Sequence, residues 1–152
     1  MPSNSAEKAK RIFQEQKAHC AQAIFSAYGE QLNEGKVDFD TCMKIASAFC
    51  GGIANTGNIC GALSGALMAI GLKYGGDTMN EDATMEESMN VIKIGRKLLD
   101  EFKSLNGSIM CRELIKHDLL TDENLMQAME KGCFDNCPKF VEDVTMILDK
   151  LL

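Results

Sequence analysis

The stretch "GNICGALSGALMAIGLKYGG", residues 57–76, decides the fold, because it carries one charge and is otherwise made of small or apolar residues. Asn58 is a good N-cap and Gly75-Gly76 a good terminator, so the stretch predicts one helix between them. No charged residue occurs from Ile45 to Leu72. The continuous apolar part starts only at Ile59, and it is too short and too weakly hydrophobic to cross a bilayer. We therefore expect a buried central helix.

One face of this expected helix is nearly bare. Gly61, Gly65 and Ala69 follow each other at intervals of four residues, which brings them onto the same side of a helix. The backbone of another element or a bound cofactor can approach such a face closely, so Gly61 and Gly65 are candidate cofactor-binding residues. The same face could carry a helix-mediated homodimer. Tight packing against a helix of the same chain is the competing interpretation.

The rest of the chain has helical periodicity. Apolar residues recur at spacings of three, four and seven, and no segment alternates with the period of two that is typical of a strand. Helices are expected over residues 5–28, from about 38 to 50, 58–74, 84–105, from 108 to about 116, 121–131 and 138–151. The prediction is an all-α fold, with residues 1–152 forming one domain, a bundle of about six to seven helices.

The charge balance limits the partners. The 152 residues include 22 acidic and 16 basic ones, a net charge of −6, and basic residues do not cluster. Nucleic acids and anionic membrane surfaces both require clustered cations, so neither is expected as a partner. The N-terminal sequence "MPSNSAEKAKRIFQEQ" has no apolar core of a secretory signal. We therefore expect no membrane insertion and a cytoplasmic location.

Seven cysteines occur, at positions 20, 42, 50, 60, 111, 133 and 137. In a reducing cytoplasm they are expected to be free thiols, metal ligands or redox groups rather than structural disulfides. Cys42 and Cys50 fit apolar helix faces and are interpreted as core residues. There is no Cys-x-x-Cys pair, and Cys133 and Cys137 are the only two close in sequence.

Three of the cysteines fall at expected helix N-termini. Cys60 lies in the first turn of the central helix, Cys111 follows the expected cap Ser108 by three residues, and Cys137 precedes Pro138. Free N–H groups and the positive end of the helix dipole stabilise a thiolate there. A lowered thiol pKa is therefore expected, above all for Cys60.

The cysteines and their surroundings together resemble a known family. The matching residues are the cysteine of "HCAQAIF", Gly51-Gly52, the hexad Cys60-Gly61-Ala62-Leu63-Ser64-Gly65, "CREL" from Cys111, and Cys137 ahead of "FVEDV". From about residue 10 to 150 the chain resembles the C_GCAxxG_C_C family, redox-active proteins with a Cys-Gly-Ala-x-x-Gly motif. The resemblance implies four characteristic cysteines, Cys20, Cys60, Cys111 and Cys137. Cys42, Cys50 and Cys133 look like extras, although Cys133 competes with Cys137 for the fourth place.

The leading hypothesis is that Cys20, Cys60, Cys111 and Cys137 converge on one site for thiol–disulfide or electron-transfer chemistry, as in a thiol-dependent oxidoreductase. An electron or thiol partner is implied but not identified by the sequence. A metal or iron–sulfur binding module is the first alternative, since four cysteine ligands also suit a tetrahedral metal or a cluster. A helical scaffold or transport accessory protein with structural cysteines is the second.

Overall fold

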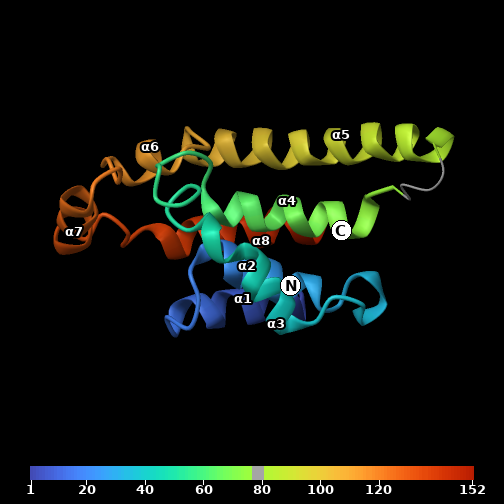
Figure 1. Ribbon diagram of the computed structural model, residues 1–152, viewed down its shortest axis with the longest axis horizontal. Helices are drawn as coiled ribbons and strands as arrows, with labels where there is room; N and C mark the ends of the chain where they lie inside the picture. The colour runs from blue at the N-terminus through green and yellow to red at the C-terminus, as the bar shows by residue number, and fades with distance from the viewer. Residues whose placement is uncertain (77–80) are drawn as a thin grey trace.

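The computed structural model describes residues 1–76 and 81–152, and it leaves out the side chains of residues 33 and 81–84. Within this part the chain forms eight α-helices and two 3-10 helices, and no β-strand (Figure 1). Their bounds are α1 Asn4–Gln14, α2 Cys20–Gly29, η1 Asn33–Gly35, α3 Phe39–Ala46, η2 Ser47–Phe49, α4 Gly61–Tyr74, α5 Glu81–Asn106, α6 Cys111–Ile115, α7 Asp122–Glu130 and α8 Cys137–Leu151. The all-α prediction is confirmed.

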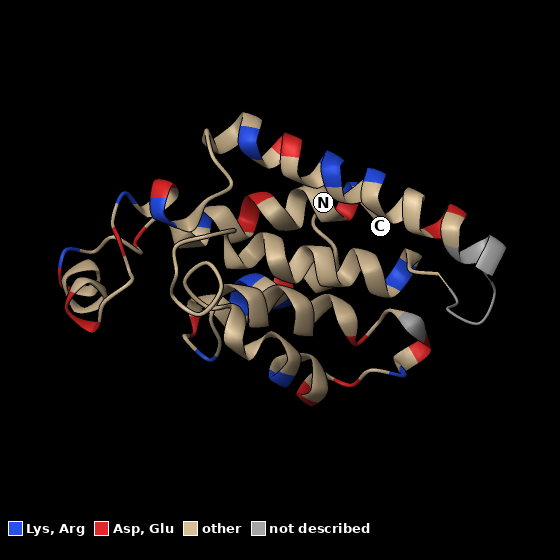
Figure 2. Ribbon diagram, turned by 45° about the horizontal axis from the view of Figure 1, so that its top comes forward, with Lys and Arg blue, Asp and Glu red and all other residues tan. Residues whose placement is uncertain are grey.

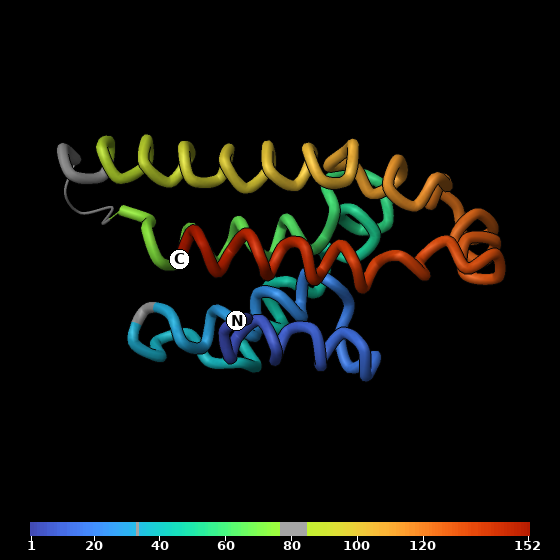
Figure 3. The backbone as a smooth tube through the Cα atoms, turned by 180° about the vertical axis from the view of Figure 1, so that it is seen from behind, coloured from blue at the N-terminus to red at the C-terminus, as the bar shows by residue number. Residues whose placement is uncertain are grey.

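The helices form three layers around α4. The long helix α5 lies on one side, α4 and α8 run beside each other in the middle, and α1, α2 and α3 form the opposite side (Figures 1 and 3). Only the last turn of α4 carries a basic residue, and the rest of the helix is uncharged (Figure 2). Its side chains are consequently able to meet neighbours on several sides, and α4 packs on α2, α5 and α8. The prediction of a buried central helix is confirmed.

The bare face of α4 packs against α2. A Cβ built on Gly65 would lie 2.6 Å from the backbone oxygen of Ala21, and one built on Gly61 would lie 2.5 Å from the sulfur of Cys20. A side chain at Gly65 would therefore force the two helices apart, and one at Gly61 would displace the sulfur of Cys20. Because α2 covers this face of α4, the face cannot carry the homodimer that the sequence suggested. Tight packing within the chain is the interpretation that the structure supports.

The helix expected over residues 5–28 is two helices. The first ends at Gln14, and Gln16 takes the left-handed conformation with φ of 56°. The N–H of Lys17 donates to the carbonyl of Ile12, and that of Gln16 to the carbonyl of Phe13, which is the hydrogen-bond pattern of a Schellman motif. Glycine normally occupies the left-handed position of this motif. Because glutamine occupies it here, no stop signal is visible at this position of the sequence.

Other helix starts also differ from their predictions, and α6 begins at Cys111 rather than at Ser108. α4 begins at Gly61 rather than near Asn58, because Asn58 and Cys60 instead bond to the backbone of residues 109–111. α5 begins at Glu81, three residues before the predicted start at Thr84, whose side chain lies outside the described residues. Among the residues that the structure describes, no helix combines the length and the apolar character that a membrane span requires.

Candidate functional site: a cavity lined by five cysteines

Five cysteines line one cavity of about 540 Å³ at the end of the bundle where α2, α4, α6 and α8 begin. They are Cys20, Cys50, Cys60, Cys111 and Cys137. Most of the remaining lining is apolar, contributed by Phe13, Ala62, Leu114, Ile115, Leu125, Met129, Phe134 and Phe140. The polar side chains in the lining are those of Gln16, His19 and Asn55. The cavity therefore combines many thiols with little else that can react.

Four of these cysteines lie at the first residue or the N-cap of a helix. Cys20, Cys111 and Cys137 are the first residues of α2, α6 and α8, and Cys60 is the N-cap of α4. Residues at a helix start have backbone N–H groups without partners inside the helix. The starts of α2, α4, α6 and α8 therefore meet at the cavity, and a cysteine lies at each of them.

Backbone pairing fixes Cys60 relative to Cys111. Ile59 and Met110 form an isolated antiparallel bridge. Beside it, the N–H of Cys60 donates to the carbonyl of Ile109 over 2.9 Å, and the N–H of Cys111 donates to the carbonyl of Asn58 over 2.6 Å. The segments before α4 and α6 are thus tied together although they are far apart in sequence. Cys60 and Cys111 are therefore held at a fixed position relative to each other in the cavity wall.

Cys50 enters the cavity at the start of an unusual turn. The five residues that follow it all have positive φ: Gly51 62°, Gly52 71°, Ile53 68°, Ala54 49° and Asn55 57°. A positive φ costs a non-glycine residue roughly 1–2 kcal/mol, so the turn is strained at three positions. Hydrogen bonds hold it, among them those from the N–H of Asn55 to the carbonyl of Cys50 and from the N–H of Asn58 to the carbonyl of Gly52.

The turn also packs directly on Cys111. A Cβ built on Gly52 would lie 2.7 Å from the Cβ of Cys111 and 2.6 Å from the backbone nitrogen of Asn58. Only glycine fits between these groups at this φ. Gly52 therefore lets the turn that carries Cys50 lie against the segment that carries Cys111.

Burial dominates the titration of the cavity thiols. The pKa of Cys111 is raised to about 11 and that of Cys60 to about 12, mainly because a buried thiolate loses its hydration. Burial raises the pKa of Cys137 to about 12 and also raises those of Cys20 and Cys50. At neutral pH these cysteines are therefore protonated thiols.

The expected low pKa of Cys60 is wrong, although the helix start acts in the expected direction. The N–H groups of Ala62 and Leu63, in the first turn of α4, lower the pKa of Cys60. Loss of hydration raises it by more, since the side chain is only 7% exposed. A sequence indicates that a cysteine begins a helix, but it does not indicate how deeply the sulfur is buried.

His19 is the one imidazole in the cavity wall. It is the N-cap of α2, and its Nε2 is 3.0 Å from the carbonyl oxygen of Ser47. A carbonyl only accepts, so Nε2 carries the proton and Nδ1 is unprotonated. Burial lowers the pKa of His19, which keeps the ring neutral beside Cys20.

The structure brings Cys20, Cys60, Cys111 and Cys137 to one cavity, and Gly61 is part of its wall. Gly65 is not part of the lining and instead contacts α2. Cys133 and Cys137 both pack against a smaller apolar cluster that includes Ile115, Leu119 and Ala128, but of the two only Cys137 lines the cavity.

Of the two cysteines interpreted as core residues, Cys42 is fully buried in the main core, whereas Cys50 lines the cavity. The interpretation of Cys50 is corrected accordingly. The glycine pair directly after Cys50 was the signal that could have found it, because Gly-Gly is typical of a sharp turn rather than of a helix face.

The described cysteines are all free thiols. In the same part of the chain, no three His, Cys, Asp or Glu side chains are arranged to bind one metal ion together. The sulfurs therefore surround the cavity without meeting at a point.

The sequence matches one family of known proteins. Residues 18–151 match the family described as "Putative redox-active protein (C_GCAxxG_C_C)". The chain belongs to this family. The matched region of the C_GCAxxG_C_C family contains all five cavity cysteines, and the resemblance seen in the sequence is confirmed.

A relative from Archaeoglobus fulgidus is 36% identical over 133 residues, which cover 82% of this chain and 86% of the relative. It carries the name "Uncharacterized protein". No solved structure matches the chain.

Proposed function

We propose that the cavity is a redox centre in which pairs of thiols are oxidised to disulfides and reduced again. The observation that carries the proposal is the convergence of five cysteines from separate segments on one cavity of about 540 Å³. Cysteines that only fill a core have no reason to gather there, and Cys42 illustrates that ordinary role. Membership of a redox-active family supports the same chemistry.

Cys20 and Cys60 are the pair we expect to react. The sulfur of Cys20 lies against the α-carbon of Gly61, the residue next to Cys60. Among the neighbouring thiols, Cys60 has the largest effect on the pKa of Cys20, which also indicates proximity. In the oxidation, the two thiols lose two protons and two electrons as the sulfur–sulfur bond forms. A small organic disulfide takes up both and leaves as two thiols.

The lining limits the acceptor to a small, weakly polar molecule. The reacting sulfurs are buried or half-buried, so a protein disulfide cannot reach them without movement of the helices. Exchange requires a thiolate, and burial holds the thiols protonated at neutral pH. The reaction should therefore be slow at pH 7 and accelerate as the pH rises.

An iron–sulfur cluster is the second candidate, favoured by one specific feature. α2, α4 and α8 direct their N-termini at the cavity, and such ends favour negative charge, which thiolates bound to iron would carry. Four of the five cysteines would hold the cluster. A cluster with several irons is larger than one ion, so sulfurs that do not meet at a point still suit it. Such a cluster supplies one-electron transfer.

Thiol counting under exclusion of oxygen tests both candidates. The reduced protein contains seven free thiols when unfolded, and incubation with a small aliphatic disulfide should leave five or three. Peptide mapping should then find Cys20 linked to Cys60. Seven unchanged thiols would contradict disulfide chemistry.

Iron and sulfide analysis of the protein, as purified without oxygen, separates the second candidate from the first. A cluster gives stoichiometric iron and sulfide with fewer than seven titratable thiols, whereas a thiol centre gives neither iron nor sulfide. A protein with seven unreactive thiols and no iron would support the structural role of the cysteines instead.

A further inference from the structure

The first half of α5 presents an apolar stripe to the solvent. Met85, Met89 and Ile92 are 73%, 59% and 52% exposed, and their spacing of four and three residues puts them on one side of the helix. The opposite side of α5 packs on the bundle through residues such as Leu98 and Phe102, which are fully buried. Scattered exposed apolar residues need no explanation, but a stripe at this spacing is the pattern of a helix–helix seam.

Charges of opposite sign border this stripe in a fixed order. Glu86 follows Met85 and Lys93 follows Ile92, so the two lie seven residues apart along the same edge of the stripe. Both side chains are exposed, and within the part of the chain that the structure describes neither forms an ion pair. In this half of the helix the acidic residues come first and the basic residues follow (Figure 2).

This order of acidic residues followed by basic residues is complementary in charge to the same order running in the opposite direction. When two copies of the helix run antiparallel, the acidic end of each meets the basic middle of the other. Met89 of each copy then packs against Ile92 of the second copy, while Glu86 of each lies near Lys93 of the other, across the same edge. A two-fold axis produces both pairs at once, as an isologous interface requires.

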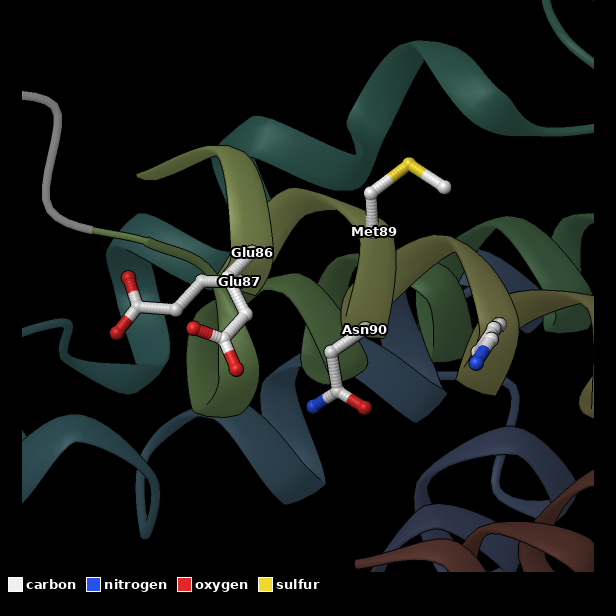
Figure 4. A pocket seen from close by; sticks show the side chains of 5 residues that line it. Glu86, Glu87, Met89 and Asn90 are labelled. Atoms are coloured by element: carbon white, nitrogen blue, oxygen red, sulfur yellow. The ribbon is translucent and has the colours of Figure 1, made fainter. Parts of the chain in front are cut away.

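We propose that a second copy of this chain covers the stripe Met85, Met89 and Ile92, and that the two α5 helices pair antiparallel with reciprocal Glu86–Lys93 contacts. In Figure 4, Met89 leaves α5 away from Glu86 and Asn90, so the apolar and polar edges of the proposed seam are separate. The interface excludes the cysteine cavity, which lies at the other end of the bundle. It therefore does not depend on the proposed redox function.

Charge reversal tests the proposal. An interface of three apolar residues per copy is small, so the dimer should dissociate on dilution, and sedimentation velocity is measured over a concentration series. Glu86→Lys alone, or Lys93→Glu alone, should raise the dissociation constant roughly tenfold or more, because two attractive contacts per dimer become repulsive. An equimolar mixture of the two single variants should form a heterodimer, since each then meets the opposite charge.

The double variant Glu86→Lys/Lys93→Glu should dimerise like the parent. Met89→Lys should abolish the dimer, whereas Met146→Lys, on an exposed methionine of α8, should leave it intact. A parent protein that stays monomeric throughout the series would overturn the proposal. Single reversals that dimerise like the parent would overturn it too. Circular dichroism of each variant establishes that the fold is retained.

Discussion

The sulfur of Cys20 rests on the α-carbon of Gly61, so closely that a Cβ at Gly61 would lie 2.5 Å from it. Glycine after Cys60 thus determines where the sulfur from the facing helix sits. The other close atoms at this point are the backbone oxygen of Phe49, at 3.1 Å, and the backbone nitrogen of Ala21, at 3.3 Å. Of the three, only the sulfur can move by rotating a side chain.

Gly61→Ala should therefore disturb the chemistry more than the stability. The added methyl group displaces the sulfur of Cys20, and we expect a loss of about 1 kcal/mol in the free energy of unfolding. The yield of the Cys20–Cys60 disulfide should fall severalfold. Urea unfolding of the reduced protein measures the first effect, and peptide mapping after oxidation measures the second. A variant that forms this disulfide as readily as the parent would contradict the assigned pair.

Gly65→Ala should be costlier, because its new methyl group meets backbone that cannot rotate away. The Cβ would lie 2.6 Å from the oxygen of Ala21, so we expect a loss of roughly 1–3 kcal/mol in the free energy of unfolding. Gly71→Ala, in the same helix, is the matched control. Nothing lies within 4 Å of its Cβ, and helix propensity should stabilise it by up to about 1 kcal/mol. Equal effects at the two positions would refute the close packing of α4 on α2.

Stability should fall steeply in alkaline solution. A thiol that titrates at 9.0 when unfolded and at about 12 when folded, as for Cys60, remains protonated in the folded protein while the unfolded chain loses its proton. Between about pH 9 and pH 12 the free energy of unfolding therefore falls by about 1.4 kcal/mol per pH unit for each such thiol. Below pH 9 both states are protonated and the effect is absent.

The contribution of one thiol is the difference between the parent and Cys60→Ala. Urea unfolding of both reduced proteins at several pH values should give a shallower decline for the variant, because it has one fewer buried thiol. Parallel curves would mean that Cys60 is not buried as described.

Cys50→Ser should alter the oxidation of the cavity, whereas Cys133→Ser should not. Cys50 lines the cavity together with Cys20, Cys60, Cys111 and Cys137, whereas Cys133 lies outside its lining. When the parent forms two disulfides, Cys50→Ser should change the pairing or the rate severalfold, since one of five neighbouring thiols is missing. Time-resolved thiol counting with peptide mapping measures this. If Cys133→Ser has the larger effect, the fifth position has been assigned to the wrong cysteine.

The sequence predicted the helices well because their caps and apolar spacing are local signals. It also predicted that Cys20, Cys60, Cys111 and Cys137 converge, from the placement of three of them at helix starts together with the family resemblance, since no local pattern links positions so far apart. The end of the first helix before Gln16 was not predicted, because the left-handed position holds glutamine instead of glycine. Cys50 was not predicted as a cavity residue because its neighbours fit an apolar helix face. The glycine pair that follows it is the feature that indicates a turn instead.

The thiol pKa values could not be predicted for a different reason. A helix start and a buried site act on a thiolate in opposite directions, and their balance depends on packing from α2, α6 and α8, which no local segment contains. For Cys60 the two influences are both present and burial is the larger.

Residues 51–55 all have positive φ, the sign that D-amino acids favour. At Ile53 and Ala54 the encoded L-residue is therefore the less favourable enantiomer, and a D-residue would occupy its own energy minimum there. The local chirality of the main chain is thus imposed by the surrounding contacts, chiefly those of Asn58 and Cys111, and not by the residues that adopt it. In this segment, tertiary contacts hold L-amino acids in a backbone conformation that their own stereochemistry disfavours.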